Sequence, residues 1–211
     1  EILVIDNRFV SERVNQLRSW GIDFVLGDIL DKDLIKKYCK DADVVHHLAG
    51  ITDVPRVKSE SSEVKDNKIK LVAKEGTQNI LDSISNKCKI IFPSTHVVYE
   101  GIEKVKNNIL EDENTKPILS YASSKAENEK QLKKSGKNYV ILRLGSVYGY
   151  STDTARIDIM PNLFSKITSQ DGTLKLFAGG RQLKSLVPLI DVARCFKYME
   201  EREDISSEIF N

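Results

Sequence analysis

The sequence predicts an α/β fold: a doubly wound, Rossmann-like parallel sheet with a smaller C-terminal substrate lobe. The first observation is that short, continuous apolar runs alternate along the chain with segments whose apolar residues have helical spacing. The second is that these runs lack polar alternation, which is typical of parallel strands covered on both faces. The third is size, because 211 residues with 40% apolar content can bury the core of one large domain or one and a half. Such alternation produces a sheet with right-handed crossovers.

The first part of the chain predicts strands separated by a helix. The segment 31–41 has apolar residues at helical spacing, and Asp31 stands where a helix N-cap is expected. The apolar runs around it each end in a turn-former or a small residue. The predicted strands are "EILVID" (1–6), "DFVLGDI" (23–29) and "ADVVHHLAG" (42–50).

The alternation continues as far as Gly149 and then changes. We expect a long helix over 62–85, a helix that begins near Tyr121, and strands over 89–95 and 139–149. Past Gly149 the pattern predicts a loop and a helix in 151–168. Residues 174–200 then predict a strand, a Gly-Gly turn, a second strand and a helix. This later part is expected to form a smaller cap or substrate lobe.

Composition excludes several classes of function. Charges nearly balance, with 32 basic and 31 acidic residues and no basic block, so no nucleic-acid partner is expected. No run approaches the roughly 18 apolar residues that span a membrane, and the sequence does not open like a signal peptide; we expect a cytoplasmic protein. The three cysteines lack CxxC spacing and the three histidines do not cluster, so neither a disulfide nor a metal site is expected.

Seven short motifs lie at or near the expected strand ends, where ligands bind in doubly wound sheets. In this order they resemble the extended short-chain dehydrogenase/reductase family, specifically its NAD-dependent nucleotide-sugar epimerases and dehydratases of the UDP-glucose 4-epimerase type. The resemblance covers nearly all of the chain. The motifs are "VIDN" (4–7), "GDILD" (27–31), "HLAG" (47–50), "STHVVYEG" (94–101), "YASSK" (121–125), "LRLGSVYG" (142–149) and "GGRQLKSLVPLIDVA" (179–193).

The sequence departs from the family at its start, because no Gly-rich loop follows the first strand. "GDILD" matches the family's third strand, so the first strand, the Gly-rich turn and the first helix are expected to precede residue 1. The end, "SSEIFN" (206–211), resembles a strand that further substrate-lobe residues would follow. We therefore expect residues 1–150 to form an NAD-binding domain without its N-terminal βα unit, and 151–211 to form part of the substrate-binding lobe.

Tyr121 and Lys125 are the first candidate catalytic residues. Residues four apart share a helix face, so the phenol and the ammonium can converge on one ligand, and a nearby cation favours the phenolate. The resemblance implies that Tyr121 takes a proton from a sugar hydroxyl while hydride leaves the same carbon for NAD. It also implies that Lys125 binds the nicotinamide ribose and that Thr95 bonds to the reacting oxygen. Taken alone, the pair could equally be an amphipathic helix residue and a solvated charge.

The resemblance also implies binding residues. Asp6 would accept hydrogen bonds from ribose hydroxyls and repel a 2′-phosphate, which favours NAD over NADP. Asp28 by itself could be a turn cap, and Lys184 a surface charge. The candidates for NAD are Asp6, Asn7, Asp28, Ile29, Leu48, Ala49, Gly50, Tyr121 and Lys125. The candidates for the nucleotide-diphosphate sugar are Thr95, Ser146 and Lys184.

The reaction type follows from the residues after Thr95. Sugar dehydratases of this family carry an acidic pair there, whereas this chain has His96 and Val97, and valine cannot exchange a proton. The resemblance therefore implies epimerisation at C4 through a transient 4-keto sugar, with a keto-sugar reductase or dehydrogenase as the alternative and a 4,6-dehydratase less favoured. A non-catalytic, dinucleotide-sensing scaffold is the alternative from another class. A homodimer through the helix that carries Tyr121 and Lys125 is also expected.

Overall fold

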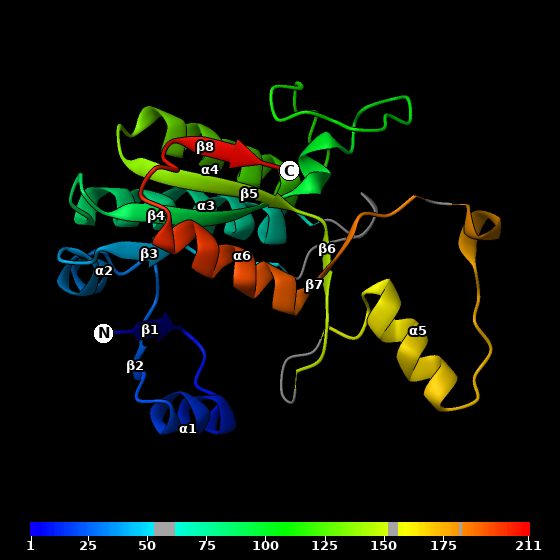
Figure 1. Cartoon of the computed structure of the whole chain (residues 1–211), viewed down its shortest axis with the longest axis horizontal. Coiled ribbons are helices and arrows are strands. Elements are labelled where there is room, and N and C mark those ends of the chain that lie inside the picture. The colour runs from blue at the N-terminus through cyan, green and yellow to red at the C-terminus, as the bar shows by residue number, and fades with distance from the viewer. Residues whose placement is uncertain (53–61, 152–155, 182) are drawn as a thin grey trace.

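The computed structural model describes residues 1–52, 62–151, 156–181 and 183–211 (Figure 1). Its strands pair in parallel and its helices lie between them in the chain, which confirms the predicted α/β, Rossmann-like class. The largest sheet has the order β3-β4-β5-β8, formed by Val44–His46, Lys89–Thr95, Asn138–Leu144 and Glu208–Phe210. Two parallel pairs accompany it: β1 (Leu3–Asp6) with β2 (Asp23–Leu26), and β6 (Ser146–Tyr148) with β7 (Leu186–Pro188).

Helices follow most of the strands, and the expected cap of one is present. The side chain of Asp31 accepts a hydrogen bond from the Leu34 amide at 3.0 Å and so starts α2. Short 3-10 turns form at His96–Tyr99 (η2) and Phe177–Gly180 (η3). The α-helices are α1 (Ser11–Ser19), α2 (Lys32–Cys39), α3 (Glu63–Ser83), α4 (Ser120–Lys134), α5 (Met160–Ser169) and α6 (Leu189–Glu201).

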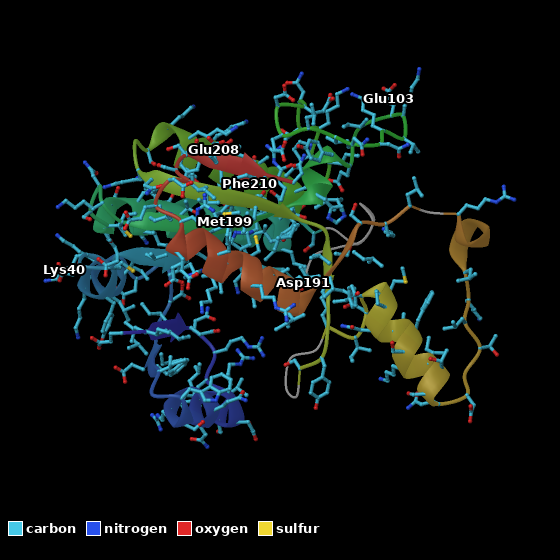
Figure 2. The ribbon with its side chains drawn as sticks, in the orientation of Figure 1. Lys40, Glu103, Asp191, Met199, Glu208 and Phe210 are labelled. Atoms are coloured by element: carbon cyan, nitrogen blue, oxygen red, sulfur yellow. The ribbon has the colours of Figure 1, made fainter. Side chains whose placement is uncertain are left out.

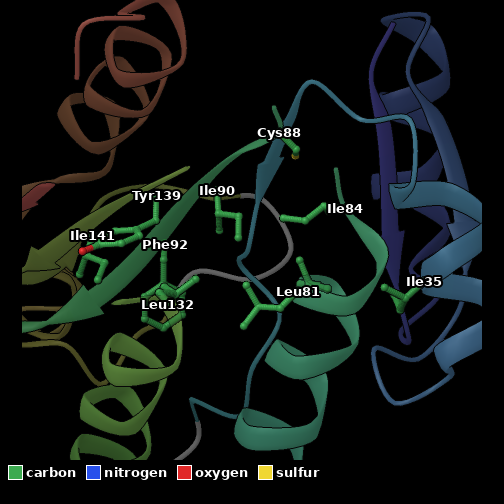
Figure 3. Close-up of a cluster of buried hydrophobic side chains, with 10 residues drawn as sticks. Ile35, Leu81, Ile84, Cys88, Ile90, Phe92, Leu132, Tyr139 and Ile141 are labelled. Atoms are coloured by element: carbon green, nitrogen blue, oxygen red, sulfur yellow. The ribbon is translucent and has the colours of Figure 1, made fainter. Parts of the chain in front are cut away.

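Both faces of the four-stranded sheet are covered, as its uninterrupted apolar strands require. Because side chains alternate along a strand, Ile90 and Phe92 of β4 point to one face and Ile91 to the other. The first face packs against α2, α3 and α4 in a buried cluster (Figure 3). The second face packs against α6, whose Met199 lies beside the strands (Figure 2). The first cluster consists of Ile35, Ile80, Leu81, Ile84, Cys88, Ile90, Phe92, Leu132, Tyr139 and Ile141.

The expected strand over 139–149 is divided in two. Gly145 separates β5 from β6, and a Cβ on it would come within 2.9 Å of the Ser185 carbonyl oxygen. The backbone of residue 185 therefore approaches closely at this point, and β6 leaves the large sheet to pair with β7. The strands expected over 23–29 and 42–50 are present as the shorter β2 and β3.

Other elements differ from the pattern. The strand expected at the start of 174–200 is wrong, because residues 173–176 have no regular structure and lead into η3. Helix α1 was not predicted, since it has no apolar stripe and buries only Val14. Helix α6 and strand β8, which the predicted division assigns to the second lobe, pack on the large sheet. The domain boundary itself stays a prediction.

Within the described residues, the β1–β2 pair is not joined to the four-stranded sheet. Strand β1 pairs with β2, and β3 pairs with β4, but within the described ranges no register joins β1 to β3. Across those same ranges, none of the helices is both long and apolar enough to cross a bilayer.

The burial of Leu132 in the core cluster should contribute strongly to stability. Leu132 of α4 is 0% exposed within the first cluster. Leu132→Ala should therefore lower the free energy of unfolding by about 2–5 kcal/mol, through lost transfer energy and a residual cavity. The matched control is Leu110→Ala at a side chain that is 63% exposed, which should change it by less than about 0.5 kcal/mol. Equal effects in urea titrations would contradict this account of the core.

Candidate functional site

Thr95 and Tyr121 meet at the carboxyl end of β4. Thr95 is the last residue of the strand, and its Oγ1 accepts the Val97 amide at 3.3 Å, which starts η2. Tyr121 lies in the first turn of α4, close enough to Thr95 for the Thr95 side chain to lower the pKa of the phenol. The structure therefore brings together two of the three predicted catalytic side chains, which are 26 positions apart in sequence. A sugar oxygen placed at this end of the sheet could meet both hydroxyls.

Lys125 lies one turn further along α4 and is only 9% exposed. Its Nζ donates to the Pro93 carbonyl oxygen at 2.8 Å and lies 4.3 Å from the centre of the Phe92 ring. Burial lowers the pKa of Lys125 to about 8, and the charge of Glu129 opposes that fall. The ammonium therefore stays mostly protonated at neutral pH, and its position is fixed against the strand that ends in Thr95.

The charges around Tyr121 include one that the sequence did not predict. Burial raises the pKa of Tyr121 above its usual value, and the charge of Arg156 and the Thr95 side chain offset only part of that rise. The Lys125 ammonium points to the Pro93 carbonyl, and its predicted effect on the phenol stays a prediction. Sequence reasoning missed Arg156, which follows β6 and forms an ion pair with Asp158 at 3.0 Å. No motif marks a single arginine in a loop, so only the fold could place it near the phenol.

The ends of β1 and β2 lie together through polar contacts. Asn7 Nδ2 donates to Asp28 Oδ2 at 3.1 Å, and Asp28 Oδ1 accepts the Leu30 amide at 2.9 Å. These two bonds, the Leu30 amide first, hold the pKa of Asp28 below its usual value. Asp6 accepts the Arg8 amide at 2.8 Å. The structure thus brings Asp6, Asn7 and Asp28 together, and Asp28 does act as the turn cap considered as an alternative.

The end of β3 offers an open surface. Leu48, Ala49 and Gly50 are all exposed, and a Cβ built on Gly50 would meet nothing within 4 Å. Ile29 lies differently, because its side chain packs against Gly76 of α3. A carboxylate acceptor at the end of β1 and an open strand end at β3 fit the ribose hydroxyls and flat rings of a dinucleotide. The individual binding roles stay predictions.

Two of the three residues predicted for the substrate side, Ser146 and Lys184, lie in or just before neighbouring strands. Ser146 opens β6, and its amide donates to the Ser185 carbonyl oxygen at 2.8 Å. Lys184 immediately precedes that residue and is exposed. The pairing of β6 with β7 therefore brings Ser146 close to Lys184, although the two residues are far apart in sequence.

His47 is a buried polar residue that sequence reasoning did not assign to the site. Its Nε2 lies 2.8 Å from Thr77 Oγ1, an oxygen that already accepts Asn128 Nδ2 at 2.9 Å. A hydroxyl oxygen can accept two hydrogen bonds, so the direction of the bond between Thr77 and His47 Nε2 depends on the histidine tautomer. Among the described residues, His47 Nδ1 has no hydrogen-bond partner. Burial first, and then the Lys125 charge, lowers the pKa of His47 to about 3.

A parallel α/β sheet with a carboxylate at one strand end, and with Thr95, Tyr121 and Lys125 near another, is typical of dinucleotide-dependent enzymes. The model of the NAD dependent epimerase/dehydratase family matches residues 1–211, and the chain belongs to that family. Membership confirms both the resemblance seen in the motifs and NAD as the cofactor. The homodimer and the domain boundary remain predictions.

Individual relatives cover the chain fully or in large part. A structure of UDP-glucuronic acid 4-epimerase from Bacillus cereus with NAD is 25% identical, with a TM-score of 0.80, and the match covers 100% of this chain and 69% of that one. UDP-N-acetyl-alpha-D-glucosaminuronate decarboxylase of Bacillus cytotoxicus is 25% identical over 100% of this chain and 66% of its own length. CDP-paratose 2-epimerase of Salmonella typhi is 30% identical over 71% and 51%. The chain thus spans two thirds or less of these curated relatives.

The neutral, buried His47 predicts acid sensitivity. Its pKa is about 3 when folded and about 6.5 when unfolded, so the unfolded state binds the extra proton first as the pH falls. The contribution of this histidine to stability is complete above about pH 6.5 and declines toward pH 3. At about pH 5.5 protonation of the unfolded state should lower the free energy of unfolding by about 1 kcal/mol.

Urea titrations from pH 7.5 to 5 would measure this decline. His47→Gln should flatten it, while the control His46→Gln should retain it, because His46 is only half-buried and faces Glu200 at 3.1 Å. A decline that is unchanged in His47→Gln would contradict the neutral, buried state of this histidine.

Proposed function

We propose that the full-length protein epimerises a nucleotide-diphosphate sugar at C4 through a transient 4-keto intermediate. The observation that carries the proposal is the placement of Tyr121 beside Thr95 at the end of β4, close enough for Thr95 to lower the pKa of the phenol, with the buried Lys125 one turn away. NAD, when bound, accepts a hydride from C4 and returns it. The family and its 4-epimerase relative support this reaction class.

The side chains of this chain would handle the proton and the oxygen. Tyr121, as phenolate, takes the proton of the C4 hydroxyl, and the Thr95 hydroxyl donates a hydrogen bond to the same oxygen as it becomes a carbonyl. The positive charge of Arg156 favours the phenolate, but burial is the larger effect and keeps the pKa of Tyr121 above its usual value. After the keto sugar turns and is reduced on its other face, Tyr121 returns the proton to the oxygen. No net oxidation results.

The residues after Thr95 support epimerisation rather than dehydration. Loss of water from a keto sugar needs groups that exchange protons next to the reacting carbon. Val97 has none, and His96 points its Nδ1 toward the Leu144 carbonyl oxygen at 3.0 Å. Net reduction of a keto sugar uses the same three residues, so it is the competing outcome in the experiment.

Product analysis tests the reaction type. The full-length protein with NAD and a panel of UDP-, dTDP- and CDP-sugars should interconvert one pair of 4-epimers without accumulating NADH. Chromatography would separate the epimers, and absorbance at 340 nm would follow NADH. A 4-keto-6-deoxy product would overturn the role given to Val97, whereas one NADH per turnover would establish the dehydrogenase instead.

Tyr121→Phe separates catalysis from structure, because it removes one hydroxyl and keeps the ring. Turnover should fall by about 10²- to 10⁴-fold, the usual contribution of general acid–base assistance, while the fold and the NAD affinity persist. Tyr139→Phe is the matched control, since Tyr139 is a buried tyrosine of the core cluster. Retention of more than about a tenth of normal turnover in Tyr121→Phe would refute the catalytic role.

A further inference from the structure

A buried ion pair lies directly behind the candidate catalytic residues. Glu129 of α4 and Arg143 of β5 have side chains that are only 4% and 3% exposed. The guanidinium binds the carboxylate through two bonds, Nη2 to Oε2 at 2.8 Å and Nε to Oε1 at 3.1 Å. Such a pair stays charged in the interior only because each partner neutralises the other.

The pair connects several elements. Ser94 of β4 donates its hydroxyl to Glu129 Oε1 at 2.5 Å. Arg143 Nη1 donates to the Glu111 carbonyl oxygen at 3.0 Å and to the Tyr99 hydroxyl of η2. The turn that follows Thr95 is therefore held by the same guanidinium that holds α4.

Three consecutive residues of β4 each contact one of three residues on a single face of α4. The Pro93 carbonyl accepts from Lys125, the Ser94 hydroxyl donates to Glu129, and Thr95 lies close enough to Tyr121 to lower the pKa of its phenol. The helix residues are four apart, so all three project from the same side of α4. The two candidate catalytic contacts and the contact of the ion pair thus form one continuous set, and a slip of α4 would break all of them.

Lys125 and Glu129 also interact through their charges. Burial lowers the pKa of Lys125, and Glu129 is the group whose negative charge raises it. The other titratable groups near this lysine are Tyr121 on its own helix and His47 at the end of β3, which is neutral at physiological pH. Loss of the Glu129 charge would therefore shift the pKa of Lys125 further down.

We propose that the Glu129–Arg143 pair, through Ser94, is a positioning element that fixes α4 on the end of β4 and so sets the geometry of Tyr121 and the charge of Lys125. This inference rests on the proposed function, because it assigns a purpose to the placement of those two residues. Glu129 and Arg143 act through their neighbours, so they are positioning and not catalytic residues.

Four variants of the full-length protein test the proposal. Ser94→Ala removes the link to β4 and leaves the ion pair intact; kcat should fall about tenfold, with KM and NAD affinity within about twofold, as expected for a small misplacement of reacting groups. Ser124→Ala is the matched control. This serine is also buried in α4, and its hydroxyl has no hydrogen-bond partner within the described part of the chain. Its kcat should stay within about twofold.

Glu129→Gln and the double variant Glu129→Gln/Arg143→Met separate positioning from simple stability. The single change leaves a buried guanidinium without its counter-charge and should lower the Tm, whereas the double change removes that charge and should recover most of it. In both, kcat should stay at least about tenfold low. In Glu129→Gln, the acetylation of Lys125, measured by peptide mass spectrometry as a function of pH, should have its midpoint at lower pH than in the unaltered protein.

The outcomes are distinct. Recovery of kcat together with Tm in the double variant, an unshifted acetylation midpoint, or normal kcat in Ser94→Ala would each overturn the positioning role. If Glu129→Gln does not fold, Ser94→Ala and the double variant still decide. The proposed function fails separately, if Tyr121→Phe keeps its activity in the same assay.

Discussion

Strand β4 lies at the centre of the sheet, paired along its whole length with β5 from Lys89↔Asn138 to Thr95↔Leu144. Almost all of its side chains are buried, so helices must cover both of its faces. Hydrogen bonds to the neighbouring strands satisfy buried backbone groups of β4, and the apolar side chains supply the favourable transfer energy. Polar chemistry is then possible only where the strand ends, and that is where Thr95 lies.

The same constraint explains why so many polar groups are buried nearby. Lys125, Glu129, Arg143 and His47 all lie in the interior, which is costly unless each finds partners. The carbonyl of Pro93 and the hydroxyls of Ser94 and Thr77 provide them. A polar network of this kind has fewer alternative packings than an apolar contact, because its geometry is directional. It therefore suits a place where the proposed reaction requires fixed side chains.

The two ends of the candidate site differ in how they are built. The end formed by Thr95, Tyr121 and Lys125 is largely buried, whereas the end formed by Asp6, Asp28 and Gly50 is open and its carboxylates bind backbone amides of their own loops. Acceptors and an open strand end are what a dinucleotide needs, since the ligand brings its own hydroxyls and rings. Rigid placement matters more where a proton moves than where a ribose is bound.

The sequence by itself determined many of the elements and the candidate catalytic pair. Strand β4 matches its predicted bounds, Asp31 caps its helix, and Tyr121 and Lys125 share a face, because apolar periodicity, capping and helical spacing are local properties. Only the tertiary structure decided what surrounds them. Arg156 acts on the Tyr121 phenol, and Arg143 pairs with Glu129 from another element, because such contacts depend on chain crossings that leave no local pattern.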